Sequence, residues 1–247
     1  MTAPTSDRTR YYQEEANSGS YLSPDYNQAV IRELLTLVPA GQTQRVGDLG
    51  SGAGSNLATL RSAFPKATIV TLDLSLVALQ TGRAAFDRAL PTQADACAIP
   101  LASGCLDLIV CTEVLEHVEN MDPVFREIRR VLNPAGRVVI SSPNYLNPMG
   151  LRKWFNDKRQ GDSFWDPWGG HQGFERLMLP SSMKQALAPY FQIETVRGAG
   201  YVMGWLPLSY SRVGALSDQY PCRWMGRLPI IKHTAMNRYL LLKPSRA

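Results

Sequence analysis

The sequence lacks several patterns that would assign it to other classes of protein. It holds four cysteines, none of them in a C-x-x-C pair, and we interpret them as reduced core thiols in a reducing compartment. No apolar run approaches about 18 residues, the length of a membrane span, and no basic start is followed by an apolar run. We therefore expect a soluble, cytoplasmic protein with no membrane span.

The composition is that of one globular domain with additions. Hydrophobic residues make up 45% of the 247 residues and charged residues 19%, which is far from a disordered chain. The length suits one α/β domain with a full core better than two domains. The formal net charge is +5, but Lys and Arg are spread along the chain, so nucleic acid is not favoured as a partner.

A glycine-rich stretch organises the rest of the chain. Residues 46–54 read V-G-D-L-G-S-G-A-G, a short apolar approach to an acid followed by glycines at every second position. Glycine allows a sharp turn from strand to helix and leaves no Cβ between the backbone and a ligand. The pattern predicts a nucleotide-like cofactor at the end of the first strand.

Strand and helix patterns alternate around this stretch. Strands are predicted at 45–49, 67–73, 106–112, 137–142, 190–197 and 237–242. Helices are predicted at 25–37, 57–64, 76–90, 123–132 and 181–187. This alternation predicts a doubly wound α/β sheet with helices on both faces, in which ligands bind beyond the carboxyl ends of the strands.

Four acids fall at predicted strand ends, namely Asp48, Asp73, Asp95 and Glu113. Gly54 and Asp73 are separated by close to the roughly 20 residues at which dinucleotide folds place a ribose-binding acid. We therefore expect one crevice that holds the cofactor.

The domain is expected to carry three additions. Residues 1–24 are interpreted as an N-terminal lid segment, and 25–247 as a single domain. Irregular segments at about 143–180 and 198–232 are interpreted as substrate-side insertions, whose Trp and Tyr rings would give apolar walls to an acceptor.

Over roughly residues 25–197 the sequence resembles the class I S-adenosylmethionine-dependent methyltransferases. The likeness is carried by D-L-G-S-G-A-G at 48–54, where an acid precedes the glycines and no glycine follows at 55, unlike the G-x-G-x-x-G of dinucleotide folds. It implies a Rossmann-like seven-stranded sheet and S-adenosylmethionine as cofactor.

The resemblance also implies roles for individual residues. Asp73 would accept both ribose hydroxyls, Asp95 with Ala96 would meet the adenine, and Asp48 would orient the methionine end. The full predicted cofactor site is Asp48, Gly50, Ser51, Gly52, Gly54, Asp73, Leu74, Asp95, Ala96 and Thr112.

A second motif, E-x-x-E-H, covers residues 113–117. On a helix, Glu113, Glu116 and His117 would share one face. The motif resembles segments of ubiquinone-pathway O-methyltransferases and of small-RNA terminal 2′-O-methyltransferases, and His171 would complete the RNA group's site. Two interpretations stay open. These four residues bind Mg²⁺ or Mn²⁺, or the pocket is metal-free and His117 or His171 acts as general base beside Glu113.

The expected function is methyl transfer from S-adenosylmethionine to a small-molecule acceptor, such as a secondary metabolite, at a hydroxyl oxygen. Alternatives are N- or C-methylation of a small molecule, RNA 2′-O-methylation, and a non-catalytic cofactor-binding protein. The basic pI of about 9.1 speaks for RNA, but no RNA-binding appendage is recognisable.

Overall fold

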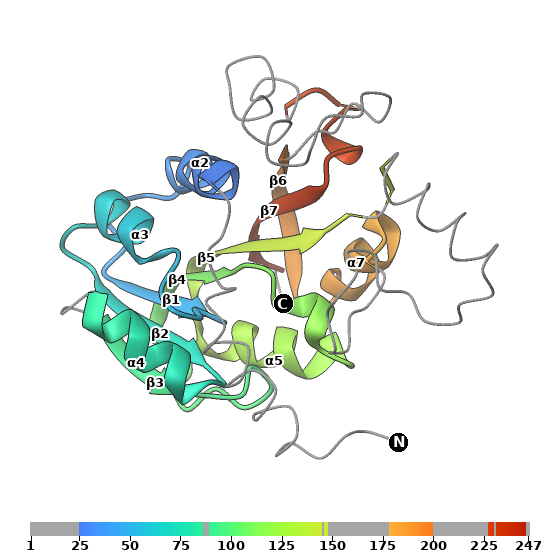
Figure 1. Cartoon of the computed structure of the whole chain (residues 1–247). Helices are drawn as coiled ribbons and strands as arrows, with labels where there is room; N and C mark the ends of the chain where they lie inside the picture. The colour runs from blue at the N-terminus through green and yellow to red at the C-terminus, as the bar shows by residue number, and fades with distance from the viewer. Residues whose placement is uncertain are drawn as a thin grey trace, which may run out of the picture.

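The computed structural model of the protein describes residues 25–85, 89–144, 146–147, 178–199, 227–229 and 231–245. They form a seven-stranded sheet in the order β3-β2-β1-β4-β5-β7-β6, with helices on both faces (Figure 1). The α/β class predicted from the sequence is confirmed. The predicted lid at 1–24 and most of the predicted insertions at 143–180 and 198–232 lie outside the described residues.

The strands are β1 (Arg45–Leu49), β2 (Thr68–Asp73), β3 (Ala89–Gln93), β4 (Leu106–Cys111), β5 (Leu132–Pro143), β6 (Phe191–Ala199) and β7 (Asn237–Pro244). The helices are α2 (Asp25–Leu35), α3 (Leu57–Ala63), α4 (Leu76–Ala85), α5 (Met121–Val131) and α7 (Pro180–Leu187), with the 3-10 turns η1 (Leu115–His117) and η2 (Ile231–His233). Pairs from β3 to β5 are parallel, and β7 is antiparallel to both its neighbours. The chain runs from β1 outward through β2 to β3 and then crosses back to β4 on the other side of β1. This reversal places the topological switch point between β1 and β4.

Two hydrophobic clusters hold the helices against the sheet. One cluster packs α2 and α3 on one face, and the other packs α5 and α7 on the opposite face. In α5, the side chains of Val124, Phe125 and Ile128 are fully buried and recur at helical spacing, so this helix presents one apolar stripe to the sheet. Because helices cover both faces of the sheet, a ligand is expected to bind at the carboxyl ends of the parallel strands.

The helix predicted at 76–90 is too long. Helix α4 ends at Ala85, and Ala89 already begins strand β3 at the edge of the sheet. Ala89 is buried while the next residue, Leu90, is 54% exposed, which is the alternation of a strand. Pro91 is tolerated because an edge strand does not need every backbone N–H group.

Strand β5 begins at Leu132, five residues before the predicted start at 137. Its first residues include the N-P-A-G segment, and the pairing with β4 is irregular between Leu106 and Leu108. A Cβ on Gly136 would lie 2.9 Å from the carbonyl oxygen of Asp107, so glycine is needed for the close approach of the two strands.

Two expectations concern features beyond the sheet. Within the described ranges, no helix is both long enough and apolar enough to cross a membrane. Of the described cysteines, Cys111 is buried and Cys97 and Cys105 are half-buried.

We predict that Gly50→Ala destabilises the fold far more than Gly104→Ala. Both glycines have positive φ values, +70° and +67°, but only at Gly50 would a Cβ meet another atom, Val114 Cγ2, at 2.1 Å. Strain and overpacking together should cost about 3 kcal/mol at Gly50, against about 1 kcal/mol of strain alone at Gly104. Urea unfolding followed by circular dichroism measures both losses.

The matched test adds Val114→Ala to the Gly50→Ala background. The smaller side chain should restore part of the lost free energy of unfolding. Equal losses at the two glycines, or no recovery in the double variant, would contradict the steric explanation.

Candidate functional site

The glycine loop folds back over the end of β2. Gly50, Gly52 and Gly54 have φ values of 70°, 52° and 87°, in the left-handed region that favours glycine. The backbone N–H groups of Gly50 and Ser51 donate to the carbonyl oxygen of Leu72 at 2.7 and 3.1 Å. The loop is therefore fixed to its neighbouring strand.

The side chain of Asp73, at the end of β2, also binds the glycine loop. The backbone N–H of Gly52 donates to Asp73 Oδ2 and that of Ser75 to Oδ1, each at 2.8 Å. Burial raises the pKa of Asp73, and the N–H groups of Ser75, Gly52 and Leu74 oppose that rise. Each carboxylate oxygen can accept a second hydrogen bond, so Asp73 still has the capacity to bind hydroxyl groups.

Asp48, at the end of β1, belongs to a buried side-chain network. The side-chain amide of Asn56 donates to Asp48 Oδ1 and to Thr112 Oγ1, both at 3.0 Å. Gln28 Nε2 donates to Asn56 Oδ1 at 3.1 Å, and the Thr59 hydroxyl donates to Gln28 Oε1 at 2.7 Å. The network connects α2 and α3 to β1 and to the residue that follows β4.

Asn56, Gln28 and Thr59 were missed by the sequence analysis. Asn56 stands at the N-cap of α3 but makes no capping bond with its side chain. A polar residue directly after the glycine loop was the one available signal, because the contacts of Gln28 and Thr59 form only in the folded chain.

The second carboxylate oxygen of Asp48 is unsatisfied. No group in the described part of the chain donates to Asp48 Oδ2, and the side chain is fully buried. Burial raises the pKa of Asp48 to about 7, against the Asn56 hydrogen bond, and the nearby charge of Asp73 raises it further. The loop therefore encloses an acid that a cationic group would stabilise in its ionised form.

The loop after β3 joins the same edge of the sheet. The backbone N–H of Ala94 donates to the carbonyl oxygen of Asp73 at 2.9 Å, and Gln93 Nε2 donates to that of Leu74 at 3.0 Å. The carboxylate of Asp95 accepts from the N–H of Cys97 at 2.8 Å, which holds its side chain within its own turn. The structure thus carries the glycine loop, Asp73, Asp95 and Ala96 to one edge.

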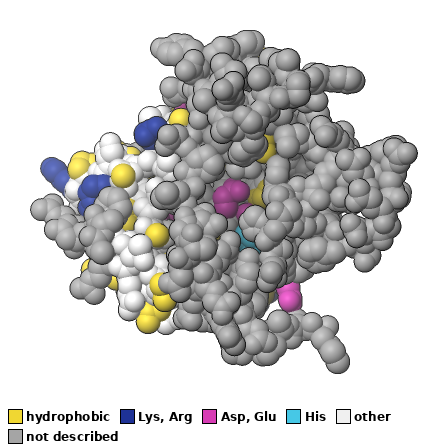
Figure 2. Space-filling model, viewed as in Figure 1, with side chains coloured by type: hydrophobic (Ala, Val, Ile, Leu, Met, Phe, Trp, Pro, Cys, Tyr) yellow, Lys and Arg dark blue, Asp and Glu magenta, His cyan; other side chains and the backbone are white. Residues whose placement is uncertain are grey.

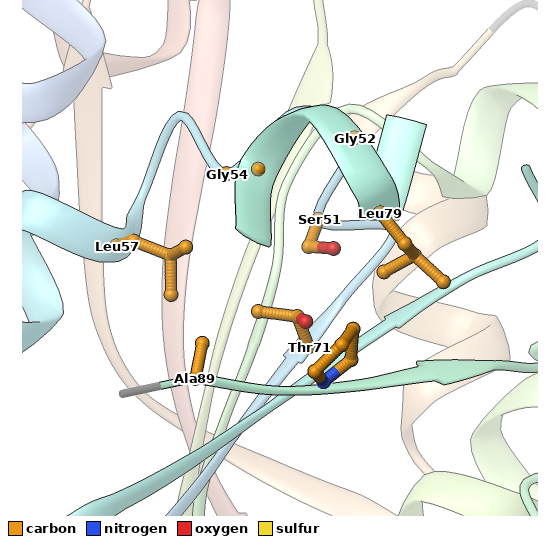
Figure 3. A pocket seen from close by; sticks show the side chains of 9 residues that line it. Ser51, Gly52, Gly54, Leu57, Thr71, Leu79 and Ala89 are labelled. Atoms are coloured by element: carbon orange, nitrogen blue, oxygen red, sulfur yellow. The ribbon is translucent and has the colours of Figure 1, made fainter. Parts of the chain in front are cut away.

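A small pocket lies under the glycine loop. Figure 3 shows the side chains of Ser51, Leu57, Thr71 and Leu79 converging on it from the loop, α3, β2 and α4. Gly52, Gly54, Gly82, Ala89 and Pro91 complete its lining. Because the acids at the strand ends do not line this pocket, we do not assign the cofactor to it.

Glu113 follows β4 in a strained conformation. It has a φ of 54°, a value uncommon outside glycine, and it is the one described non-glycine residue with positive φ. Its N–H donates to Ser141 Oγ at 3.0 Å, and the Ser141 hydroxyl donates back to Glu113 Oε1 at 2.6 Å. This reciprocal pair, from β4 to β5, holds the carboxylate at the edge of the sheet.

The predicted helix through the E-x-x-E-H motif is wrong. Only Leu115–His117 form a single 3-10 turn, because the left-handed backbone of Glu113 cannot belong to a right-handed helix. Glu116 is 1% exposed and, with Asp48, its charge adds to the burial that raises the pKa of Cys111. Glu116 therefore lies in the core.

The metal interpretation receives no support from this geometry. Glu113, Glu116 and His117 do not form a metal-binding group, and no three His, Cys, Asp or Glu side chains do so within the described ranges. The fourth proposed ligand, His171, lies outside the described residues. In Figure 2, acidic side chains and a histidine are visible near the centre of one face.

The sheet order, the switch point and the acid-rimmed glycine loop together define a class I methyltransferase fold. Residues 47–140 match the family model for a methyltransferase domain. The crystal structure of an S-adenosylmethionine-dependent methyltransferase from Mesorhizobium loti superposes with a TM-score of 0.57 at 20% identity, covering 86% of this chain and 96% of that one. The predicted class I methyltransferase fold is confirmed, and residues 47–140 are the part of the chain that matches a methyltransferase domain.

Two curated relatives come from bacteria. A malonyl-[acyl-carrier protein] O-methyltransferase of Marinomonas sp. is 31% identical over 135 residues, which is 53% of this chain and 50% of that protein. A trans-aconitate 2-methyltransferase of Azoarcus sp. is 33% identical over 125 residues, 50% of this chain and 49% of that protein. The chain spans about half the length of these relatives.

We predict that Asp48→Asn removes a decline in stability between about pH 4 and pH 7. Because burial raises the pKa of Asp48 from its ordinary value of 3.8 to about 7 in the folded state, the folded protein binds more protons than the unfolded one in this window. The free energy of unfolding therefore falls as the pH rises. Each unit of pKa difference is worth about 1.4 kcal/mol.

Urea unfolding of both proteins at pH 5 and pH 7.5 measures this effect. Asparagine keeps an acceptor for Asn56, and Asp73 titrates alike in both proteins to first order. The stability of the variant relative to the wild type should increase with pH, and a constant difference would contradict an ionising Asp48.

Proposed function

We propose that the protein transfers the methyl group of S-adenosylmethionine to an oxygen atom of a small-molecule acceptor. The observation that carries this proposal is the buried Asp48 under the glycine loop, with one oxygen held by Asn56 and the other unsatisfied. A buried carboxylate in this state suits a cationic cofactor better than a pyrophosphate.

The residues at the edge of the sheet fit this cofactor. Asp73 would bind the ribose hydroxyls, because its carboxylate lies at the end of β2 beside the glycine loop and a carboxylate has more acceptor positions than the backbone N–H groups use. Asp95 and Ala96 would contact the adenine, and Leu74 would lie beside it. Asp48 and the loop would hold the methionine end, while Thr112, fixed by Asn56, would form the floor.

The bound cofactor supplies a methyl group on a sulfonium, which is activated for in-line displacement. The chain has to position the acceptor oxygen and to receive its proton, so positioning carries most of the catalysis. Glu113 is suited to the proton because its carboxylate is fixed by Ser141 at the end of β4, beside the switch point. His117, the last residue of the 3-10 turn η1, is the second candidate base.

The two curated relatives support oxygen as the acceptor atom only to the extent that one is named an O-methyltransferase. Methylation of RNA is an outcome that the transfer assay below distinguishes, and methylation of a small molecule at nitrogen or carbon is the other alternative. A divalent metal does not enter the proposal, because its described ligands do not come together.

We predict that Asp73→Asn raises the dissociation constant of S-adenosylmethionine at least tenfold. The amide nitrogen cannot accept a hydrogen bond, and hydrogen bonds to charged groups are worth about 1.5–3 kcal/mol. Titration calorimetry with the full chain measures the loss.

Asp107→Asn is the matched control. Asp107 lies in β4 at the opposite end of the strand and accepts from the backbone of Gln44 and Arg45, so its variant should bind the cofactor like the wild type. Failure of the wild type to bind would overturn the proposal. Transfer of labelled methyl groups to RNA but not to small molecules would replace it by the RNA alternative.

We predict that Ser141→Ala lowers kcat about tenfold while cofactor affinity stays unchanged. The variant loses both hydrogen bonds that hold Glu113 in its strained conformation, and about 1.4 kcal/mol of lost positioning corresponds to tenfold in rate. Steady-state kinetics with any acceptor found in the methyl-transfer screen measures it.

The control is Ser103→Ala, an exposed residue whose hydroxyl lies 3.5 Å from Arg130. It should leave kcat unchanged. A Ser141→Ala variant with wild-type kcat would remove Glu113 from the catalytic role.

A further inference from the structure

Arg238 in β7 is a buried cation without a hydrogen-bonding partner for Nε. The residue is 8% exposed, and no group among the described residues accepts a hydrogen bond from Nε. Burial lowers the pKa of its guanidinium, and no carboxylate in the described part of the chain opposes that effect. A buried charge of this kind destabilises a fold unless something pairs with it, so its presence calls for a ligand.

Arg238 lies two strands away from the end of β4, at the same edge of the sheet as the candidate site. Arg238 pairs in register with Ser142 of β5. The preceding residue, Ser141, holds Glu113 at the end of β4. With neighbouring strands about 4.8 Å apart, Arg238 lies roughly 10 Å across the sheet from the end of β4, on the side away from the glycine loop.

The segment that leads into β7, just before Arg238, is held by hydrogen bonds from Asn144. The side-chain amide of Asn144, directly after β5, donates to the carbonyl oxygens of His233 and Ala235 at 2.8 and 2.7 Å. The backbone N–H of Asn144 donates to the carbonyl of Met236 at 2.6 Å. These bonds fix the backbone of the segment that leads into β7.

Other basic groups lie near Arg238. Burial lowers the pKa of His233, and the charges of Arg238 and Lys232 lower it further. Positive potential therefore gathers at this end of the edge, whereas the glycine-loop end carries Asp48, Asp73 and Asp95.

We infer that Arg238 binds an anionic oxygen group, a carboxylate or a phosphate, of the methyl acceptor and so determines which acceptors are methylated. This rests on the proposed methyl transfer, with the cofactor at the acidic end of the crevice and the acceptor beyond Glu113. The planar guanidinium presents a fork of donors that matches two oxygens at once, and a bound anion neutralises the buried charge.

The test uses the full chain with malonate, inorganic phosphate and the neutral malonamide as probes. Titration calorimetry should show saturable binding of malonate or phosphate, at least tenfold weaker in Arg238→Met, with malonamide not binding. Arg238→Lys should lie in between, since lysine keeps the charge but not the fork. The tighter of the two anions distinguishes a planar from a tetrahedral group. Absence of saturable anion binding, or equal binding by Arg238→Met, would overturn the inference.

Thermal unfolding separates this role from a structural one. Without ligand, Arg238→Met should melt at a higher temperature than the wild type, because it removes an uncompensated buried charge. The control is Arg197→Met on neighbouring β6, which should melt lower because Arg197 Nε pairs with Glu33 at 2.8 Å. A lower melting temperature for Arg238→Met would show a structural role and overturn the inference.

Cofactor binding distinguishes the two levels of the proposal. Arg238→Met should bind S-adenosylmethionine like the wild type, because it lies away from the glycine loop. If the wild type binds the anions but not S-adenosylmethionine, the anion site stands and the proposed methyl transfer fails.

Discussion

The side-chain amide of Asn56 connects β1 and β4, the neighbouring strands on the two sides of the switch point of the sheet. It donates to Asp48 near the end of β1 and to Thr112 after β4, each at 3.0 Å, and so closes the glycine loop that runs between Asp48 and Asn56 itself. The loop has no hydrophobic core of its own, since alternate residues are glycine. Its shape therefore depends on this bond and on the backbone bonds to Leu72 and Asp73.

The charges along the edge of the sheet are separated by sign. Asp48 and Asp73 lie at the ends of β1 and β2 and Asp95 follows β3, whereas Lys232 and Arg238 lie before and within β7. Glu113 stands between the two groups, held by Ser141. A cationic cofactor and an anionic acceptor would each be attracted to the end of opposite sign, and the reacting atoms would then meet beside Glu113.

Local patterns could be predicted from the sequence, and contacts between distant segments could not. The glycine loop and the acids at 48, 73 and 95 were predicted because strand ends and turns leave signals within a few residues. Asn56, Gln28 and Arg238 were not identified as site residues, since their partners are remote in sequence. The helix expected through the motif at 113–117 was wrong for a local reason. The helical spacing of Glu113, Glu116 and His117 does not reveal the left-handed backbone of Glu113, which the Ser141 hydroxyl stabilises.

Three features that lower stability gather at this edge: the buried acid Asp48, the strained Glu113 and the buried cation Arg238. Two half-buried arginines elsewhere in the described chain are paired. Arg130 bonds Glu127 and the carbonyls of Ile99 and Leu101, and Arg137 bonds Glu194. Selection for stability alone would remove such features, so their concentration indicates a functional site. A sulfonium cofactor would compensate Asp48 and an anionic acceptor Arg238, which means that each ligand would relieve a cost built into the fold.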